Sequence, residues 1–175
     1  IVKADYEQPF LKGKLGVGFK LNSVETDNTF DFFNVEDGTS VIDTGRSNSF
    51  VYKEMVNAGY INYNVRMKKW SFQAGLRAEH TDWSGDLTSL KPGDDEDPKG
   101  EKYLSWFPSA AVTFAMNEKN QFSLTYSRRI DRPSYRDLNP FEDKLDELTY
   151  RKGNPYLRPQ FTNSVELTHT FMGFL

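Results

Sequence analysis

Apolar and polar residues alternate along most of this chain. The clearest run begins at Trp70, where every second residue up to Ala78 is apolar and the residues between are polar or glycine. A period of two is typical of a β-strand with one apolar and one polar face. Comparable runs predict strands at about 14–22, 50–65, 70–79, 110–116, 121–127 and 161–171. The pattern therefore predicts an all-β chain of about six antiparallel, up-and-down strands.

The predicted strand at 50–65 is less regular than the others. Its apolar residues occupy even positions from Val56 to Tyr60 and odd positions from Ile61 to Val65. One extra residue in a strand moves every later side chain to the opposite face. We therefore expect a β-bulge near Gly59.

The connections between the predicted strands alternate in length. Long polar stretches at 23–49, 81–103 and 130–159 alternate with short ones at 66–69 and 117–120. Outer-membrane barrels have short periplasmic turns and long extracellular loops, whereas a Greek-key sandwich has no reason to alternate in this way. The pattern predicts a partial transmembrane β-barrel in which the first, third and fifth strands run outward.

The three tryptophans fit the same interpretation. Trp70 begins a strand at its short-turn end, and Trp83 and Trp106 lie where strands meet a long loop. Aromatic residues form girdles at both surfaces of a membrane barrel. The alternative, that these rings close the ends of a soluble core, stays open on the tryptophans alone.

The composition excludes several classes of protein. The 175 residues include 37% hydrophobic residues and no cysteine, so a disulfide framework and thiolate metal sites are excluded. No stretch approaches the ~18–20 apolar residues that a spanning helix needs. The net charge of −3 gives no general attraction to nucleic acid or anionic lipid. No signal peptide is present, and the ends at Ile1 and Leu175 have the character of fragment boundaries.

One stretch resembles a known family. The sequence YSRRIDRPSYRDLNPF at 126–141, followed by GNPYLRPQ at 153–160, resembles TonB-dependent receptor barrels, most closely the outer membrane protein β-barrel family. Weaker similarity lies upstream at 70–77 and 107–110. Gln160 stands where glutamate is common and Thr168 where glycine is common, which separates the chain from siderophore receptors. The resemblance assigns structural roles to Arg132, Pro133, Gly153, Asn154, Pro155, Leu157, Pro159, Glu166 and Leu167.

The resemblance implies a larger protein of the outer membrane of a Gram-negative-type bacterium. Its barrel would have about 22 strands around an N-terminal plug. Its partners would be outer-membrane lipid, an unknown small nutrient, and an inner-membrane energy-coupling protein that acts through the plug. Since the smallest membrane barrel has eight strands, we interpret 1–175 as one barrel segment that lacks the plug and the remaining strands. In the motif, Gly153 suits a positive φ, and Pro155 and Pro159 stiffen the approach to the last strand.

Several polar residues are candidates for the lumen of such a barrel. They are Lys20, Gln73, Arg77, Glu79, Arg129 and Glu166. As a functional site they would line a transport path or contact a plug. The simpler interpretation is that each is solvated or pairs with a charge on a neighbouring strand.

Two charged stretches have other interpretations. Four arginines between Arg128 and Arg136 could form a phosphate or nucleic-acid patch, but Asp131 and Asp137 lie among them and the chain is net acidic, which argues against nucleic acid. Arg128 falls on the apolar face at a strand end, where it would reach the lipid headgroups. The acidic run 94–97 lacks EF-hand spacing, so an acidic surface loop is favoured over a calcium site.

Catalytic chemistry has little support. The two histidines, His80 and His169, form no His-Glu-x-x-His motif, and no Gly-x-Ser-x-Gly elbow is present. A glycosidase carboxylate pair has no fixed spacing and is not excluded.

We expect a non-enzymatic transport or receptor protein without cofactor or metal. The alternative is a secreted antiparallel β-sandwich acting as a binding or adhesion module. An isolated barrel segment exposes its lipid face, so we expect copies to associate through that face or through open sheet edges.

Overall fold

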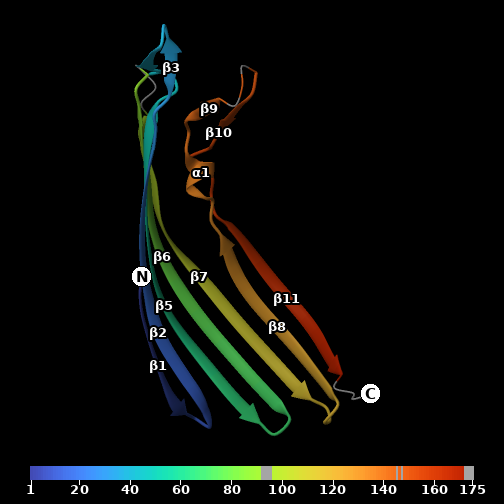
Figure 1. The fold of residues 1–175 in the computed structure, drawn as a ribbon. Helices are drawn as coiled ribbons and strands as arrows, with labels where there is room; N and C mark the ends of the chain where they lie inside the picture. The colour runs from blue at the N-terminus through green and yellow to red at the C-terminus, as the bar shows by residue number, and fades with distance from the viewer. Residues whose placement is uncertain (92–95, 145, 147, 172–175) are drawn as a thin grey trace.

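The main feature of the molecule is one curved antiparallel sheet (Figure 1). The computed structural model describes residues 1–91, 96–144, 146 and 148–171, without the side chains of 96–97 and 142–144. The sheet has seven strands in the order β1-β2-β5-β6-β7-β8-β11. Their bounds are Val2–Phe10, Gly13–Phe30, Asn48–Met67, Trp70–Ser89, Glu96–Ala115, Asn120–Asp131 and Gln160–Phe171. The all-β, up-and-down prediction is confirmed, but the sheet has seven strands rather than six.

The additional strand is β1, which pairs with β2 along its whole length. Its sequence does alternate, since Val2, Ala4 and Tyr6 lie on one face and charged residues lie between them. The strand also contains Pro9. Because β1 is an edge strand, a proline without an N–H group is tolerated there. The period-of-two signal was thus present over residues 2–7 and sufficient to predict this strand.

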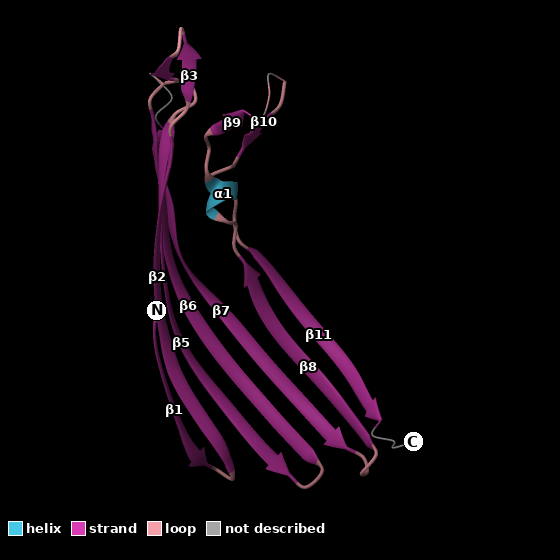
Figure 2. Ribbon diagram, viewed as in Figure 1, coloured by secondary structure: helices cyan, strands magenta, loops and turns pink. Residues whose placement is uncertain are grey.

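The connections alternate between the two ends of the sheet as predicted (Figure 2), but the long connections predicted at 23–49 and 81–103 are wrong in extent, because β2 continues to Phe30, β6 to Ser89 and β7 begins at Glu96. The short turns at 11–12, 68–69 and 116–119 lie at one end of the sheet. The long connections lie at the other end. One contains the hairpin of β3 (Phe33–Glu36) and β4 (Thr39–Ile42), and another contains α1 (Tyr135–Leu138), β9 (Glu142–Lys144) and β10 (Tyr150–Lys152). Among the described residues, no helix is long and apolar enough to cross a membrane.

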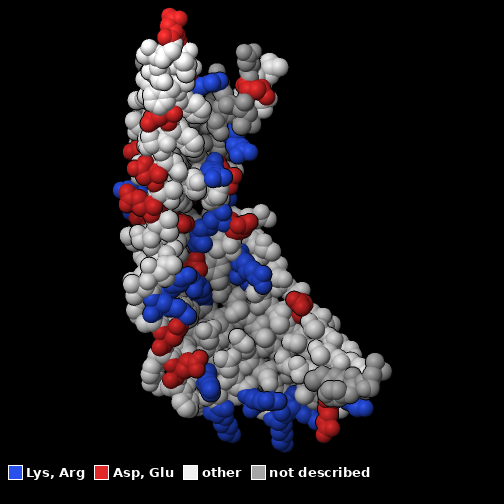
Figure 3. All heavy atoms as spheres, in the orientation of Figure 1, with Lys and Arg blue, Asp and Glu red and all other residues white. Residues whose placement is uncertain are grey.

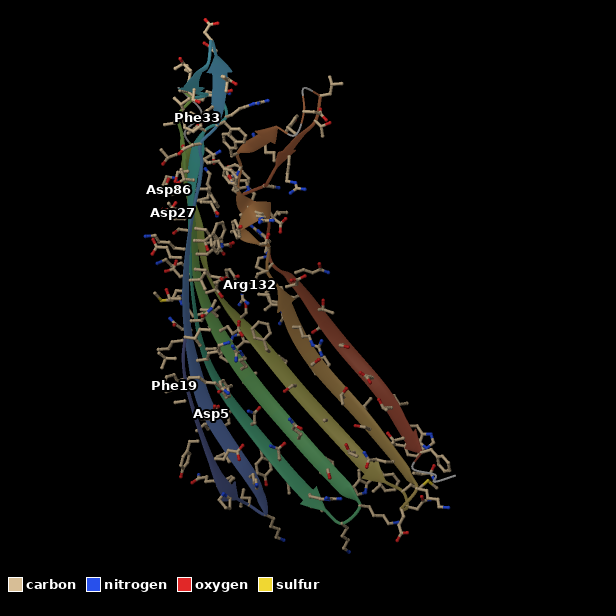
Figure 4. All side chains as sticks on the ribbon, viewed as in Figure 1. Asp5, Phe19, Asp27, Phe33, Asp86 and Arg132 are labelled. Atoms are coloured by element: carbon tan, nitrogen blue, oxygen red, sulfur yellow. The ribbon has the colours of Figure 1, made fainter. Side chains whose placement is uncertain are left out.

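One face of the sheet carries a broad apolar surface, here called the apolar band. It comprises alternate residues of Leu15–Leu21, Met55–Met67, Trp70–Ala78, Leu104–Phe114, Phe122–Ile130 and Phe161–Phe171. Phe19 is 46% exposed and Leu167 is 74% exposed, so no second layer covers the band within the described residues. Phe19 points away from the concave side of the sheet (Figure 4). This arrangement is not that of a two-sheet sandwich, whose apolar faces meet in one core.

The central strands continue well past the apolar band. In this further part, the apolar side chains lie on the inner face and the polar side chains on the outer face. In β6 the band covers residues 70–78, close to the ~9–11 residues of a tilted membrane strand. Beyond it, the same outer face carries polar residues such as Asp82 and Asp86. On the opposite, inner face, Trp83 and Leu87 are buried, only 8% and 6% exposed. Strands β2 and β6, with 18 and 20 residues, are therefore about twice as long as the alternation pattern alone had indicated.

This inversion also explains the irregular pattern in β5. The expected bulge near Gly59 is wrong, because the pairing of β5 with β2 and with β6 runs through this residue without a shift. Between Gly59 and the short-turn end, apolar side chains such as Ile61 face outward. Between Gly59 and the end with the long connections, Ala58 and Tyr52 face inward and are buried. The change of apolar face therefore follows a change of surroundings along a regular strand.

The pairing of β7 with β8 ends beside a proline. The N–H groups of Ala115 and Met116 donate toward β6 and β8 respectively, to Lys69 and Asn120. Since N–H groups alternate sides along a strand, the missing N–H of Pro108 falls on the β8 side. The β7–β8 ladder stops at the adjacent Ser109. Above this point β7 stays with β6, and the connection after β8 enters the inner side of the sheet (Figure 1).

Candidate functional site on the inner face

All six residues predicted to face a lumen lie on one face of the sheet. The strand registers place Lys20, Gln73, Arg77, Glu79, Arg129 and Glu166 on the inner face, opposite the apolar band. Of these, Arg77 and Glu79 are in direct contact through an ion pair. The other four lie apart, and Glu166 accepts a hydrogen bond from Thr168 at 3.0 Å.

Arg132 is the centre of a partly buried charge cluster on this face. Its guanidinium donates to Glu79 Oε2 at 2.6 Å and to Thr81 Oγ1 at 3.2 Å. Glu54 Oε1 lies 3.8 Å from Arg132 Nε. The Glu79 side chain is only 10% exposed and that of Arg132 is 26% exposed, so water screens this contact weakly. Figure 4 shows Arg132 between the sheet and the chain that follows β8.

Local sequence explains how Arg132 reaches this position. Strand β8 ends at Asp131, and Pro133 follows Arg132 directly. A proline restricts the preceding residue to extended conformations, which carries the chain out of the sheet. Ser134 then caps α1: its N–H donates to Asp137 Oδ2 at 3.0 Å, and the Asp137 N–H donates back to Ser134 Oγ. This capping box fixes the direction of the chain immediately after Arg132.

Gly153 packs against the end of α1. Its N–H donates to the Asn139 carbonyl at 2.8 Å, and the next N–H, of Asn154, donates to the Asp137 carbonyl at 2.7 Å. A Cβ at residue 153 would lie 2.4 Å from the Asn139 oxygen. The expectation of a positive φ is wrong, because among the described glycines only Gly38 has one. Close backbone approach is the reason that glycine is needed at 153.

The other motif residues hold the return to β11. The Asn154 carbonyl accepts from the Leu157 N–H at 3.2 Å, which closes a turn around Pro155. Asparagine followed by proline suits the first two positions of such a turn. Pro159 directly precedes β11. Within β11, Glu166 faces inward and Leu167 belongs to the apolar band.

A small apolar core joins residues 132–159, here called the inner segment, to the upper sheet. Phe50, Tyr52, Trp83 and Leu87 of the sheet pack with Leu138 of α1. Tyr52 and Trp83 are stacked with ring centroids 6.1 Å apart. The prediction of Trp83 as a membrane girdle residue is therefore wrong. Trp70 and Trp106 do lie on the outer face, at opposite ends of the band.

The four arginines at 128–136 do not share one surface. Arg128 lies on the outer face over the Phe161 ring, 4.7 Å from its centroid, while Arg129 faces inward and Arg132 belongs to the charge cluster. His169, also on the outer face, stacks on Phe122 at 4.5 Å. Of the acidic run 94–97, the first two residues and the later side chains lie outside the described residues. In the described part, no group of three His, Cys, Asp or Glu could hold a metal ion.

Two members of the charge cluster were missed from the sequence. Glu54 and Thr81 fall inside strands whose alternation shows only that they share the inner face. Their contact with Arg132 spans more than 50 residues, 51 for Thr81. Glu54 did carry a signal, because it lies in the half of β5 whose inner face is apolar. An unpaired carboxylate there would be costly, so a cationic partner could be expected.

The short-turn end of the molecule carries mostly basic side chains. Figure 3 shows Lys and Arg projecting from this end, whereas acidic and basic residues are mixed along the upper part. Between them lies an apolar outer band with a polar inner face, and both edge strands, β1 and β11, have one side unpaired among the described residues. These features define a segment of the wall of a membrane β-barrel.

Comparison with known families agrees with this class. The chain matches the Outer membrane protein beta-barrel family over residues 1–175. The chain belongs to this family, and the protein is located in the outer membrane. Comparison with curated proteins returned no match.

Proposed function

We propose that the protein is a TonB-dependent receptor-like transporter that takes up a nutrient across the outer membrane, without catalysing a reaction. The observation that supports this is the inner segment, which folds against the inner face and is fastened there by Arg132. A connection held in this way narrows the outer mouth of a barrel, as suits a selective receptor better than an open pore.

The partners follow from the same proposal. Lipid contacts the apolar band, and a small nutrient enters from the side of the inner segment. An inner-membrane protein supplies energy through a plug domain, which is not among the residues described. The acidic outer face above the band, with Asp27 and Asp86 (Figure 4), then lies outside the membrane.

A deletion strain tests the proposal. The strain is first grown on a panel of single nutrients to find one on which growth is impaired and restored by the intact gene. Uptake of that labelled nutrient is then measured with and without a protonophore. We expect the protonophore to abolish the uptake that depends on the gene. Uptake that persists at full rate would identify a passive pore and refute energy coupling.

A further inference from the structure

A cleft lies between the inner segment and the upper ends of β2 and β5. Its volume is about 230 Å³. The lining residues come from both sides: Asn28, Phe30, Phe32 and Asn48 from the sheet side, and Tyr135, Arg136, Asn139, Phe141, Arg151 and Gly153 from the inner segment. The elements that line the cleft, the ends of β2 and β5 and the connection that contains α1 and β10, lie at the end of the molecule opposite the short turns (Figure 1).

Two asparagines in this cleft have buried polar atoms without a hydrogen-bond partner. They are the donor Asn28 Nδ2 and the acceptor Asn48 Oδ1. Asn48 is only 4% exposed. Both residues face inward on neighbouring strands, since Asn28 pairs with Phe50 and Phe30 pairs with Asn48. Buried polar atoms are nearly always paired because leaving one unpaired is costly. The unpaired donor and the unpaired acceptor leave two hydrogen bonds open to a ligand that carries the complementary pair.

The cleft also carries positive charge. Arg136 and Arg151 line it, and Arg136 Nε donates to the Tyr135 hydroxyl at 3.1 Å. Among the side chains that the structure describes, no carboxylate lies in ion-pair distance of either guanidinium, although Asp137 acts on Arg151 from farther away. Arg151 is paired with Asp143 in the β9–β10 ladder, and the Asp143 side chain lies outside the described part. Guanidinium groups bind carboxylates with paired, charge-assisted hydrogen bonds.

The remaining walls are aromatic. Phe30, Phe32, Tyr135 and Phe141 surround the polar groups. Such walls favour an apolar side chain on the ligand. The volume lies below the ~300 Å³ at which pockets for drug-sized ligands begin, so the cleft suits one residue of a chain rather than a whole oligomer.

We propose that this cleft binds the C-terminal residue of a short peptide that ends in an apolar side chain. The terminal carboxylate lies between Arg136 and Arg151. The last peptide bond satisfies the asparagines, with its N–H donating to Asn48 Oδ1 and its C=O accepting from Asn28 Nδ2. The apolar side chain packs on the aromatic walls. A sugar acid also has a carboxylate, but its further hydroxyl groups would face these walls without partners.

This inference names a ligand class for the proposed uptake function and in that sense depends on it, but binding at equilibrium is measured without transport. The full-length protein, purified in detergent micelles, is titrated by calorimetry with Gly-Gly-Leu, with its C-terminal amide, and with glucuronate. We expect saturable binding of Gly-Gly-Leu and about tenfold weaker binding of the amide, because the amide lacks the charge that the arginines recognise. The double substitution Arg136→Gln/Arg151→Gln should weaken the binding of Gly-Gly-Leu about as much as amidation of the peptide does. Arg158→Gln, in the same connection but outside the cleft, should not.

A second variant separates a binding role from a structural one. Asn48→Leu removes the unpaired acceptor and keeps a similar volume, so it should lower peptide affinity and slow hydrogen exchange in the inner segment. If Asn48 were purely structural, the substitution would speed exchange. Arg136 and Arg151 are exposed, so their substitution tests the site even if Asn48→Leu fails to fold.

Three outcomes would overturn the proposal. Equal affinity for the peptide and its amide would show that the arginines do not recognise a terminal carboxylate. Binding of glucuronate but not of the peptide would show that the ligand is a sugar acid and not a peptide. No binding of either would show that the cleft is not a ligand site. Peptide binding together with uptake that is insensitive to the protonophore would refute energy-coupled uptake alone and leave the site in place.

Discussion

Substitution of Arg132 tests how the inner segment is fastened to the sheet. In Arg132→Gln the hydrogen-bonded ion pair with Glu79 and the nearby charge on Glu54 lose their cation. The carboxylate of Glu79 then remains on the inner face with Arg77 as its one cationic partner among the described residues. We expect the inner segment to leave the sheet more often, while the strands themselves stay paired.

The expected cost follows from burial. Removing one partner of a fully buried pair costs about 3–5 kcal/mol. Here the Glu79 side chain is 10% exposed, but that of Arg132 is 26% exposed and Arg77 stays bound to Glu79. We therefore expect a loss of about 2–3 kcal/mol, which increases opening of the inner segment roughly 30- to 140-fold.

Hydrogen exchange reports this opening directly. The amides of Gly153 and Asn154 are hydrogen-bonded to carbonyls at the end of α1 and should exchange when the inner segment opens. Exchange is measured on the full-length protein in detergent micelles at constant pH. The substitutions Arg132→Gln and Glu79→Gln, alone and together, form a double-mutant cycle that isolates the interaction between the two side chains.

The controls define what would refute this reasoning. Arg158→Gln removes an arginine from the same connection and should leave exchange unchanged. Arg132→Lys keeps the charge but loses the planar fork, so it should fall between wild type and Arg132→Gln. If Arg132→Gln exchanged at the wild-type rate, or if its effect added to that of Glu79→Gln without coupling, the charge cluster would not fasten the inner segment.

Three further predictions concern the same region. Gly153→Ala places a methyl group against the carbonyls of α1 and should destabilise the inner segment by about 2 kcal/mol or more, measured by the same exchange, whereas Gly59→Ala, with open space around its Cβ, should be neutral. Hydrogen bonds from the Ser134 side chain and backbone lower the pKa of Asp137 in the folded protein. The ionised carboxylate should therefore contribute fully to the stability of the inner segment above the ordinary aspartate pKa of about 3.9. This contribution should be lost as the pH falls through the lower pKa of the folded state. The rate of proteolysis of the inner segment should therefore rise as the pH falls through this range. The variant Asp137→Asn, which has no carboxyl group at this position, should not show this rise. Trp83→Ala should cost about 2–4 kcal/mol and accelerate that proteolysis at neutral pH, whereas Trp106→Ala, which is 49% exposed on the outer face, should leave it unchanged.

Much of the sheet could be predicted from local pattern. Alternation identified six of the seven strands in it, and the lengths of the connections gave their antiparallel order and the end at which the long connections lie. The same alternation placed all six lumen candidates on one face, because side chains two residues apart in a strand point the same way. The resemblance identified Arg132, Gly153 and Asn154, whose hydrogen bonds hold the inner segment in place. It could not show that Gly153 is needed for close approach rather than for a positive φ.

The sequence by itself therefore determined six of the seven strands within the membrane band and which of their side chains share a face there. Only the tertiary structure decided where the apolar face changes sides, because that depends on where a strand leaves lipid and meets the inner segment. The interpretation of residues 56–65 as a bulge failed for this reason. The pairing of Arg132 with Glu79, 53 residues away, was likewise undetermined by local pattern. Periodicity reports the face of each side chain, whereas such contacts arise from strand register and from the path of the chain after β8.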